Sequence, residues 1–450
     1  MKESRYNIWT ERGDAAYVYN GVSGSLLRVP KDDHAALRRL LAGEEDSGCS
    51  PKLLVNMANG RMLVPEGSDE LAMLAKRYEG SRYDTSHFAL TMVTSLGCNF
   101  DCPYCFEAKH PSIMDDEVRQ AVLEVLDDQL PRIGSFHVTW FGGEPLVGKK
   151  PLLALSDAFI ERCDTAGVDY SADITTNGFL LDEGTCIELR DRRVSHAQVC
   201  LDGPPDIHDK MRPLAGGKPS FWGIVKNLHH AINCLPITIR VNVDRENFPH
   251  VEELLQILAD EGLSGKLDVY VGQIVGVADF APAPSASYSH ACFTNPDYAR
   301  AELAFSQLAA RYGFGRPNLP RPTGAPCTAV RANELVVGSK GELYKCWDSV
   351  GNHLEVIGNI RDYKQTNGRL TRWLKYDPFS NEECRSCIAL PVCMGGCAHH
   401  GMDLLQHENR CGSFRHTYRE QILRFVDFAE GEDRKGLMPG GGLARRMSTR

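Results

Sequence analysis

The sequence predicts an α/β protein with a parallel sheet at its centre, a small α+β module before the sheet and a cysteine-rich segment after it. Short apolar runs alternate with helical stretches between residues 87 and 280. Repeated strand–helix units of this kind form parallel sheets with right-handed crossovers. Seven of the sixteen cysteines fall between Cys327 and Cys411. In a chain of 450 residues these features predict two or three domains.

The N-terminal module is predicted to span residues 1–86. Two apolar runs flank a Gly/Ser turn, which predicts a β-hairpin. The predicted elements are strands at 15–19 and 25–29, helices near 33–42 and 50–58, and a short apolar run at 62–64. Such a module either caps the neighbouring sheet or captures an extended peptide by adding a strand to a sheet edge.

The central region, residues 87–280, is expected to supply the strands and helices of the parallel sheet. The strands are predicted at 88–95, 136–141, 170–175, 196–201, 237–243 and 267–275, and the helices at 115–130, 150–166, 182–193, 220–235 and 249–263. In the first helix Val118, Val122 and Val125 recur at i, i+4 and i+7. Asp115 and Asp116 before them suit an N-cap and a first helical turn.

Glycine and polar residues follow the predicted strand ends. A cysteine loop follows the first strand, Gly142 and Gly143 the second, Asn177 the third and Asp202 the fourth. Barrels built from strand–helix units form their active sites at the carboxyl ends of the strands. We therefore expect all these residues on one rim of the sheet.

The cysteine loop contains Cys98, Cys102 and Cys105 in a C-x3-C-x2-C pattern. Three thiolates can hold three irons of a four-iron, four-sulfur (4Fe–4S) cluster and leave the fourth iron open to a small molecule. A structural zinc ion is the alternative, but zinc takes four ligands and the nearest further candidate is His110. The ligand count favours the cluster.

The loop and the motifs after it resemble those of the radical S-adenosylmethionine (SAM) enzymes. The matching segments are Phe-Gly-Gly-Glu-Pro at 141–145, Ile-Thr-Thr-Asn-Gly at 174–178, Cys-Leu-Asp-Gly at 200–203 and His-Asp-Lys-Met-Arg-Pro at 208–213. The resemblance covers residues 87–280 and implies a partial (β/α)6 barrel, similar to a TIM barrel but open on one side. It also implies that the open iron binds SAM, whose one-electron cleavage gives a 5′-deoxyadenosyl radical that abstracts a substrate hydrogen.

The same resemblance implies which residues bind SAM. Gly142 and Gly143 would hold its methionine end, with Glu144 near the amino group. Tyr104 would lie along the adenine, and Arg212 would pair with the carboxylate.

Four further positions carry less specific expectations. Asn177 is favoured for the ribose over the two threonines before it. Cys200 stands where relatives often have a serine near the ribose or carboxylate, and as a small residue at the end of a strand it fits the core equally well. Asp202 and Asp244 suit either the site or the ordinary role of an aspartate after a strand, which is to satisfy backbone amides.

The C-terminal cysteines resemble the SPASM extension of radical SAM enzymes that modify peptides and proteins. They are Cys327, Cys346, Cys384, Cys387, Cys393, Cys397 and Cys411. The resemblance implies two auxiliary 4Fe–4S clusters, three clusters in all, with Cys384, Cys387, Cys393 and Cys411 on one and the other three cysteines on the second. A pair of zinc knuckles is the alternative, because C-x2-C spacing alone does not select the metal.

Seven thiolates leave one auxiliary cluster a ligand short. Sulfatase-maturing relatives have an eighth cysteine six residues before the one that corresponds to Cys327, and Arg321 stands there in this chain. We expect an open iron on the cluster of Cys327, Cys346 and Cys397, with Cys292 as the rival fourth ligand.

Asp348 is the candidate catalytic base. Formylglycine-forming relatives place an aspartate directly after the cysteine that corresponds to Cys346, whereas this chain has Trp347 there and Asp348 next. A carboxylate serves as a base when its surroundings raise its pKa, although a solvated or turn-capping role is commoner.

The resemblance predicts a maturase that installs a thioether or carbon–carbon crosslink in a ribosomally made precursor peptide. An auxiliary cluster would accept the second electron, and flavodoxin or ferredoxin would be the reductant. The alternatives are a sulfatase-type maturase that oxidises Cys or Ser to formylglycine, and a non-catalytic metal-cluster scaffold. The N-terminal module is similar to winged-helix-like peptide-recognition elements fused to such maturases.

Composition excludes several classes of partner. The net charge is −9 and no Lys/Arg-rich run precedes the tail, so neither nucleic acid nor a membrane surface is expected. With no signal-peptide pattern and no apolar run of about 18 residues, we expect a soluble, cytoplasmic protein whose cysteines serve metal binding rather than disulfides.

Three segments are expected after the central region. Residues 281–326 are expected to link the domains around a helix near 298–311, residues 327–425 to form the auxiliary-cluster domain, and residues 426–450 to be a flexible tail.

Overall fold

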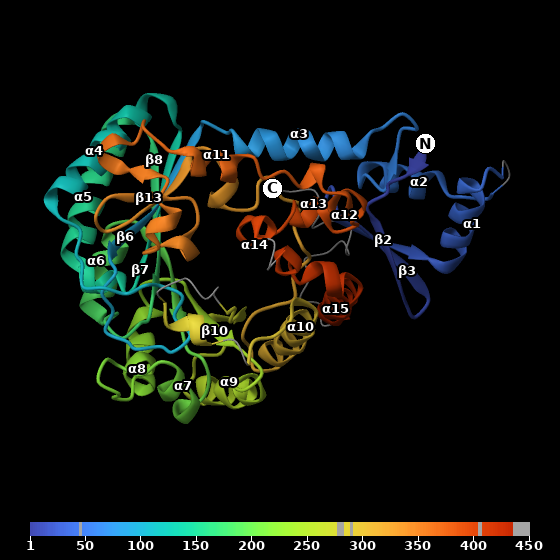
Figure 1. Cartoon of the computed structure of the whole chain (residues 1–450). Coiled ribbons are helices and arrows are strands. Elements are labelled where there is room, and N and C mark those ends of the chain that lie inside the picture. The colour runs from blue at the N-terminus through green and yellow to red at the C-terminus, as the bar shows by residue number, and fades with distance from the viewer. Residues whose placement is uncertain (45–46, 277–282, 289–290, 404–406, 435–450) are drawn as a thin grey trace. The chain divides into compact units, whose positions relative to one another are not determined.

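The computed structural model describes residues 1–44, 47–276, 283–288, 291–403 and 407–434. Its contacts divide the chain into two compact units. The larger unit contains Tyr83–Gly315 and Cys327–Tyr376, and the smaller contains Met1–Arg82, Arg316–Pro326 and Asp377–Arg450. Both units are therefore built from segments that are far apart in the sequence (Figure 1).

One mixed sheet forms the centre of the larger unit. In spatial order its strands are β11 (Asp268–Gln273), β10 (Ile237–Val243), β9 (Val194–Cys200), β8 (Asp169–Thr176), β7 (Ser135–Gly142), β6 (His87–Ser95), β12 (Glu334–Val337), β13 (Glu342–Tyr344) and β14 (Gly358–Asn359). The strands from β6 to β11 are parallel to their neighbours. This confirms the predicted α/β fold with a partial barrel.

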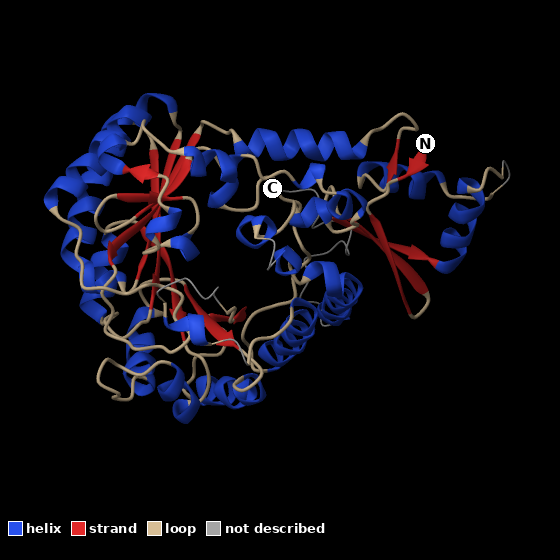
Figure 2. Ribbon diagram, viewed as in Figure 1, coloured by secondary structure: helices blue, strands red, loops and turns tan. Residues whose placement is uncertain are grey.

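Helices connect the parallel strands and cover one face of the sheet (Figure 2). They are α4 (Asp116–Gln129), α5 (Lys149–Ala166), α6 (Glu183–Asp191), α7 (Pro205–Met211), α8 (Phe221–Ala231), α9 (Val251–Asp260) and, after β11, α10 (Asn295–Arg311); α11 (Gly368–Leu374) follows β14. The predicted N-cap of α4 is present, because Asp115 accepts a hydrogen bond from the amide of Val118 at 2.8 Å. Helix α7 was not predicted, since it is too short to show a periodic pattern.

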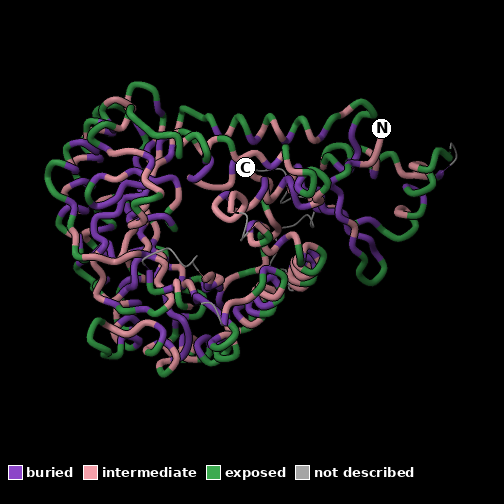
Figure 3. The backbone as a smooth tube through the Cα atoms, viewed as in Figure 1, coloured by how far each residue is buried: buried purple, intermediate pink, exposed green. Residues whose placement is uncertain are grey.

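The two faces of the sheet differ in what they contact. On β7, Phe136 and Trp140 face the helices, and their ring centroids lie 5.1 and 6.2 Å from that of Phe159 on α5. Alternate residues such as His137 and Phe141 lie on the opposite face, which we call the inner face. Figure 3 shows that buried residues follow the strands and the helix sides that meet them.

The sheet continues beyond β6 into the segment that the sequence assigns to the auxiliary clusters. β12 pairs in parallel with β6, and β13 pairs antiparallel with β12. Cys327 and Cys346 accordingly belong to the larger unit, whereas the cysteines from Cys384 onward belong to the smaller one.

The smaller unit contains the predicted N-terminal hairpin as part of a three-stranded antiparallel sheet. Its strands are β2 (Asn7–Arg12), β3 (Ala15–Asn20) and β4 (Ser25–Pro30), and β1 (Lys2–Glu3) pairs separately with β5 (Leu63–Val64). Its helices are α1 (Lys31–Leu41), α2 (Pro51–Asn59), α3 (Glu70–Arg82), α12 (Glu382–Ser386), α13 (Leu390–Cys393), α14 (Ala398–Met402) and α15 (Phe414–Arg434). The hairpin, α1 and α2 agree with the sequence-based prediction, while α3 was missed.

Helix α15 corrects one expectation about the tail. Residues 426–434 were expected to be flexible, but they continue α15. Ile422 and Val426, one turn apart, are fully buried in a core shared with Ile8 and Tyr19, so packing against the N-terminal sheet holds the helix. The rest of the expected tail, 435–450, lies outside the described residues. Neither α15 nor any other described helix is both long and apolar enough to cross a membrane.

Candidate functional site

The cluster loop, residues 96–107, follows β6 and is fastened to the segment after α7. The amide of Asp101 donates a hydrogen bond to the carbonyl of Pro213 at 2.9 Å. Lys109 Nζ donates to the carbonyl of Phe100 at 2.7 Å. These bonds fix the course of the loop that carries the three predicted cluster ligands.

The three thiols of the cluster loop are near enough to influence one another. Burial raises the pKa of Cys98 to about 11 and that of Cys105 to about 12, and the Cys102 thiol adds to both shifts. The backbone amides of Phe100 and Glu107 donate to the sulfurs of Cys98 and Cys105. Such amide donors stabilise thiolates that bind iron.

The arrangement fits the ligand set of an iron–sulfur cluster. Each thiolate of a 4Fe–4S cube binds a different iron, so the sulfurs stand apart around the cluster. The described residues contain no group of three or more His, Cys, Asp or Glu side chains that could hold a metal ion.

Gly142 and Gly143 let the end of β7 touch the cluster loop. A Cβ on Gly142, which has φ +125°, would lie 2.4 Å from the carbonyl oxygen of Ser95, and one on Gly143 would lie 2.8 Å from that of Gly97. Only glycine fits at either position. Close packing of two backbones therefore accounts for both glycines, and their contact with SAM stays a prediction.

Glu144 is buried, and its carboxylate accepts hydrogen bonds from three donors of the chain. These are Thr176 Oγ1 at 2.8 Å, the amide of Asn177 at 2.7 Å and the amide of Leu146 at 3.0 Å. Burial raises the pKa of Glu144, and the three donors oppose that shift. The side chain thus joins the ends of β7 and β8. The contact of Glu144 with the SAM amino group stays a prediction. In such a contact the amino group would bind the same carboxylate oxygens that accept these three hydrogen bonds.

Asn177 joins β8 to the cluster loop. Its Nδ2 donates to Asn99 Oδ1 at 2.7 Å and lies 4.0 Å from the sulfur of Cys98. Its Oδ1 accepts from the amide of Phe179 at 3.0 Å. Asn177 therefore lies beside the first cluster cysteine, and its role toward the ribose stays a prediction.

Tyr104, Asp202 and Arg212 form a buried polar network between the cluster loop and the end of β9. The Tyr104 hydroxyl donates to Asp202, and Arg212 donates to the same hydroxyl at 2.6 Å. Asp202 also accepts from the amide of Asn242 on β10 at 2.7 Å. Burial lowers the pKa of Arg212, but the groups around it, Tyr104 and Asp202 among them, raise it more. The pKa of Arg212 is therefore above its usual value. Asp202 thus has the backbone role expected from the sequence and a place in the site as well.

Cys200 lies next to this network on the inner face. It is 8% exposed and pairs in register with Arg240 on β10. Burial raises its pKa, and a hydrogen bond with Asn242 opposes the shift. Asp244, in contrast, caps a turn by accepting from the amides of Glu246 and Asn247 at 2.8 and 3.0 Å.

Asp348, the candidate base, is exposed in the larger unit beside Trp347. The ring of Trp347 stacks on Phe141 with centroids 6.1 Å apart, and Phe141 stacks on Phe106 of the cluster loop at 6.5 Å. A row of aromatic rings therefore connects the Asp348 segment to the cluster loop. The role of Asp348 as a base stays a prediction.

Glu107 is a residue of the site that the sequence reasoning missed. It is 3% exposed, and among the described residues neither of its carboxylate oxygens has a hydrogen-bond partner. Burial raises its pKa to about 8, and the carboxylates of Asp348 and Glu144 add to the shift. Its place two residues after Cys105 was the only signal in the sequence.

Polar residues inside β10 were also missed. Thr238, Arg240 and Asn242 alternate with buried apolar residues along this strand. In a strand flanked by neighbours on both sides, such alternation signals a polar inner face.

Four cysteines form a second group of thiols in the smaller unit. They are Cys384, Cys387, Cys393 and Cys411, the set expected to hold one auxiliary cluster. Burial raises the pKa of Cys393 to about 11, and the other three thiols add to the shift. Arg415 donates to the sulfur of Cys411 at 2.9 Å, and Arg410 forms a hydrogen bond with Cys384. Two arginines beside four thiols fit the negative charge of a thiolate-bound cluster.

The other auxiliary cysteines are divided between the units. Cys327 and Cys346 belong to the larger unit and Cys397 to the smaller one. Their shared cluster stays a prediction. Cys292, the rival fourth ligand, lies in the larger unit, where its sulfur is 3.5 Å from the carbonyl oxygen of Tyr288.

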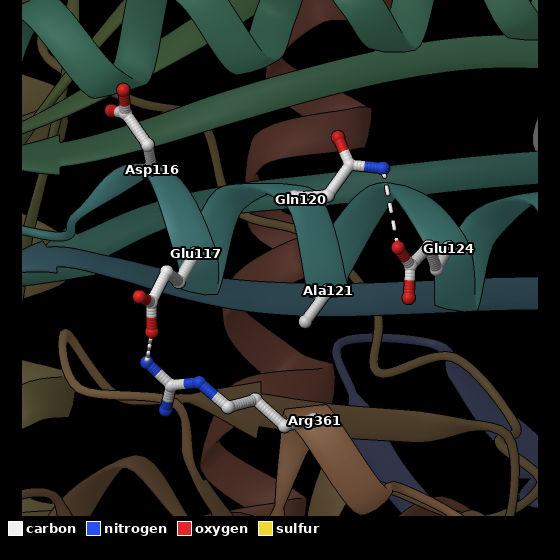
Figure 4. A pocket seen from close by; sticks show the side chains of 6 residues that line it. All are labelled: Asp116, Glu117, Gln120, Ala121, Glu124 and Arg361. Carbon is white, nitrogen blue, oxygen red and sulfur yellow. Dashed lines mark hydrogen bonds and ion pairs between the residues drawn. The ribbon is translucent and has the colours of Figure 1, made fainter.

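A surface pocket of about 480 Å³ lies along α4, away from these residues. Its lining consists of Asp116, Glu117, Gln120, Ala121, Glu124 and Arg361. Figure 4 shows Arg361 pointing to Glu117, and Gln120 to Glu124. The ion pair of Arg361 with Glu117 is 3.6 Å long, and Gln120 Nε2 donates to Glu124 Oε1 at 3.3 Å. None of the predicted site residues lines this pocket, so it is not part of the candidate site.

The comparison with known protein families decides the nature of the central region. The model of the Radical SAM superfamily matches residues 92–258. Residues 92–258 are a radical SAM domain. The match contains the cluster loop, Gly142 to Glu144, Asn177 and Arg212, so the recognition made from the motifs is confirmed.

Curated relatives of the radical SAM domain include enzymes with different substrates. The chain is 27% identical to Fe-coproporphyrin III synthase of Methanosarcina barkeri over 168 residues, which are 36% of this chain and 39% of that protein. It is 24% identical to the serine-type anaerobic sulfatase-maturating enzyme of Bacteroides thetaiotaomicron, over 68% of this chain and 81% of the relative. It is also 24% identical to PqqA peptide cyclase of Rhodopseudomonas palustris, over 71% and 84%. The chain thus spans about two fifths of the first relative and most of the other two.

Solved structures similar to the chain share the fold around the radical SAM domain. Native anSMEcpe with bound AdoMet and Cp18Cys peptide has a TM-score of 0.55 at 19% identity, covering 75% of this chain and 99% of that one. Streptococcus suis SuiB bound to precursor peptide SuiA has a TM-score of 0.51 at 13% identity, covering 92% and 99%. At these identities the likeness concerns the fold.

Proposed function

We propose that the chain is a radical SAM maturase that installs a thioether or carbon–carbon crosslink in a ribosomally made precursor peptide. One observation carries this proposal: the chain combines the three-thiol loop of the radical SAM domain with a separate group of four neighbouring thiols. The loop alone suits SAM cleavage, whereas a second cluster offers an acceptor for the electron that peptide oxidation releases. The similarity to PqqA peptide cyclase supports a peptide substrate.

The chain's own residues would hold the cofactors. When bound, a 4Fe–4S cluster and SAM supply the electron that cleaves the sulfonium and the radical that removes a hydrogen atom. Cys98, Cys102 and Cys105 would bind the cluster. The network of Tyr104 and Arg212 lies at the end of β9, where it would hold SAM in one orientation.

The overall change is the loss of two hydrogen atoms from the peptide. Bound SAM would supply the radical that removes one hydrogen atom from a peptide carbon. Formation of the new bond then releases one proton, for which Asp348 is the candidate acceptor. It also releases one electron, whose acceptor would be held by the four thiols of the smaller unit. A flavodoxin or ferredoxin would supply the electron consumed in SAM cleavage.

Oxidation of a Cys or Ser to formylglycine is the second candidate function. The similarity to a sulfatase-maturating enzyme over 68% of this chain favours it. Trp347 argues against it, because formylglycine-forming relatives have an aspartate at that position and Trp347 is stacked on Phe141.

Co-expression with a substrate tests the proposal. A short cysteine-containing reading frame beside the gene would be expressed with the chain under anaerobic conditions, and the intact mass of the peptide measured. We expect a loss of about 2 Da per crosslink that the Cys98/Cys102/Cys105→Ala variant does not produce. Fragmentation across the bond locates a crosslink, whereas labelling by an aldehyde-reactive hydrazide identifies formylglycine.

The scaffold alternative has its own test. A non-catalytic scaffold has no use for a SAM site, so the reduced, cluster-loaded chain would form no 5′-deoxyadenosine from SAM. Formation of this product, measured by chromatography and absent from the triple cysteine variant, contradicts a scaffold.

A further inference from the structure

Arg240 is an arginine of the inner face whose charge no described carboxylate neutralises by direct contact. The arginines near it in sequence have such partners: Arg212 lies 3.5 Å from Asp202, and Arg245 lies 2.7 Å from Asp297. No ion pair among the described residues includes Arg240. Its Nε donates to the neutral amide oxygen of Asn242 at 2.8 Å.

Neighbouring strands hold the guanidinium of Arg240 in one place. Arg240 pairs in register with Cys200 on β9 and with Tyr270 on β11. A Cβ on Gly272 of β11 would lie 2.4 Å from Arg240 Nε, so the guanidinium packs against the bare backbone of that glycine. The Tyr270 hydroxyl is also bonded to the guanidinium. A fixed planar donor of this kind suits a carboxylate.

The position of Arg240 separates it from the predicted SAM site. Tyr104 and Arg212 are at the carboxyl ends of the strands, and Asn242 lies within 3.4 Å of the Tyr104 hydroxyl. Arg240 is two residues further into β10, which is about 7 Å along a strand. A ligand of Arg240 would therefore contact the inner face deeper inside the partial barrel than the predicted SAM site.

A bound substrate would strip water from Arg240. A buried cation is costly unless an anion accompanies it, so the ligand that covers Arg240 has to bring one. We propose that Arg240 binds a carboxylate of the peptide substrate, carried by an acidic side chain close to the residue that is oxidised. This inference rests on the proposed function, and it narrows the substrate to peptides with Asp or Glu near the modified residue.

Binding of defined peptide pools tests the inference. The cluster-loaded chain with SAM would be titrated anaerobically against three fluorescent pools of short peptides with randomised flanks. The first has a central Glu and capped ends, the second a central Gln and capped ends, and the third a central Gln and a free C-terminal carboxylate. We expect the Glu pool to bind about tenfold more tightly than the capped Gln pool, as one charge-assisted hydrogen-bonded pair allows.

Substitutions assign that preference to Arg240. In Arg240→Gln the preference for Glu should vanish, and Arg240→Lys should keep part of it because the charge remains. Gly272→Ala displaces the guanidinium and should also abolish the preference, which covers the case in which Arg240→Gln fails to fold. Arg300→Gln, which removes an exposed arginine of α10, should keep the wild-type preference.

Several outcomes would overturn the inference. Equal binding of the two capped pools, or a preference that survives in Arg240→Gln, removes the role of Arg240. Tighter binding of the free-carboxylate pool than of the Glu pool assigns Arg240 to a chain terminus instead of a side chain. A higher Kd for SAM in Arg240→Gln, with peptide preference unchanged, assigns the arginine to the SAM carboxylate. Failure of the wild-type chain to form 5′-deoxyadenosine contradicts the proposed function and leaves the binding result to be judged separately.

Discussion

Arg212 donates a hydrogen bond to the hydroxyl of Tyr104 at 2.6 Å, so two residues predicted to bind SAM orient each other. Tyr104 precedes Cys105 in the cluster loop, and Arg212 follows helix α7. The guanidinium carbon of Arg212 also lies 5.7 Å from the ring centroid of Phe100. The position of the cluster loop and that of the predicted SAM carboxylate partner are thereby linked.

Tyr104→Phe removes this link while keeping the aromatic ring. We expect the iron content to stay normal and the rate of 5′-deoxyadenosine formation to fall about tenfold or more, because a hydrogen bond to a charged group contributes about 1.5–3 kcal/mol. The rate would be followed by chromatography under single-turnover conditions. Tyr363→Phe removes a hydroxyl that donates to Asp128 at the surface, and it should leave the rate unchanged. Equal rates in all three proteins would show that the link has no influence on SAM cleavage.

Glu144→Gln tests the junction between β7 and β8. The substitution replaces one of the two acceptor oxygens by an NH2 group, so either the bond from Asn177 or the bonds from Thr176 and Leu146 lose their acceptor. We expect the free energy of unfolding to fall by about 1–3 kcal/mol, which urea denaturation of the apo chain would measure. Glu117→Gln is the matched control, because Glu117 is 85% exposed and its only described ion pair is with Arg361. A loss of stability as large in the control as in Glu144→Gln would contradict the structural role.

The central fold was predictable because its signals are local. Each strand from β6 to β11 is a short apolar run followed by a helical stretch, and the predicted ranges agree with the structure to within a few residues. β12 to β14 were missed because they are very short and pair with residues distant in sequence, as β12 does with β6. Pairing of this kind depends on tertiary contacts that leave no periodic pattern.

The candidate site was predicted in part for a similar reason. Cys98 and Asn177 belong to motifs at strand ends, and the structure brings them to 4.0 Å. Asn242 and Arg240 belong to no motif, and their place on the inner face follows only from register with neighbouring strands. Glu107 is informative because it is buried with no hydrogen-bond partner for its carboxylate among the described residues, and burial cannot be read from a single sequence.

The two groups of thiols should be separable by iron analysis. The three 4Fe–4S clusters expected from the sequence would contain about 12 irons per chain. Cys393→Ala should reduce this to about 8 while 5′-deoxyadenosine formation continues, because its thiol belongs to the smaller unit. Anaerobic reconstitution, iron assay and electron paramagnetic resonance would measure both effects.

A buried cysteine outside both groups is the control for iron analysis. Cys163 lies fully buried in α5, and Cys163→Ala should keep the wild-type iron content. If Cys393→Ala also kept all of its iron, the assignment of Cys393 as a ligand would be wrong.

His208 should make the stability of the chain sensitive to mild acid. It is fully buried, and its Nδ1 accepts from the amide of Asp202 at 3.1 Å while its Nε2 contacts Ser220 Oγ at 3.1 Å. Burial lowers the pKa of His208 well below 6.5, and the charge of Arg212 lowers it further. The folded chain therefore keeps the imidazole neutral at a pH where the unfolded chain protonates it.

The sign of the pH effect follows from this difference in proton binding. Stability from His208 is complete above pH 6.5 and is lost progressively as the pH falls below that value toward the depressed pKa of the folded state. The slope is at most about 1.4 kcal/mol per pH unit for one proton.

Urea denaturation of the apo chain at pH 7.5, 6.5 and 5.5 should show a smaller loss of stability for His208→Gln than for the wild type, because glutamine offers an acceptor and a donor but takes up no proton. His353→Gln, at an exposed histidine, should follow the wild-type curve. Parallel curves for the wild type and His208→Gln would contradict this prediction. They would mean that the folded chain protonates His208 as readily as the unfolded chain does, despite the hydrogen bond from the amide of Asp202.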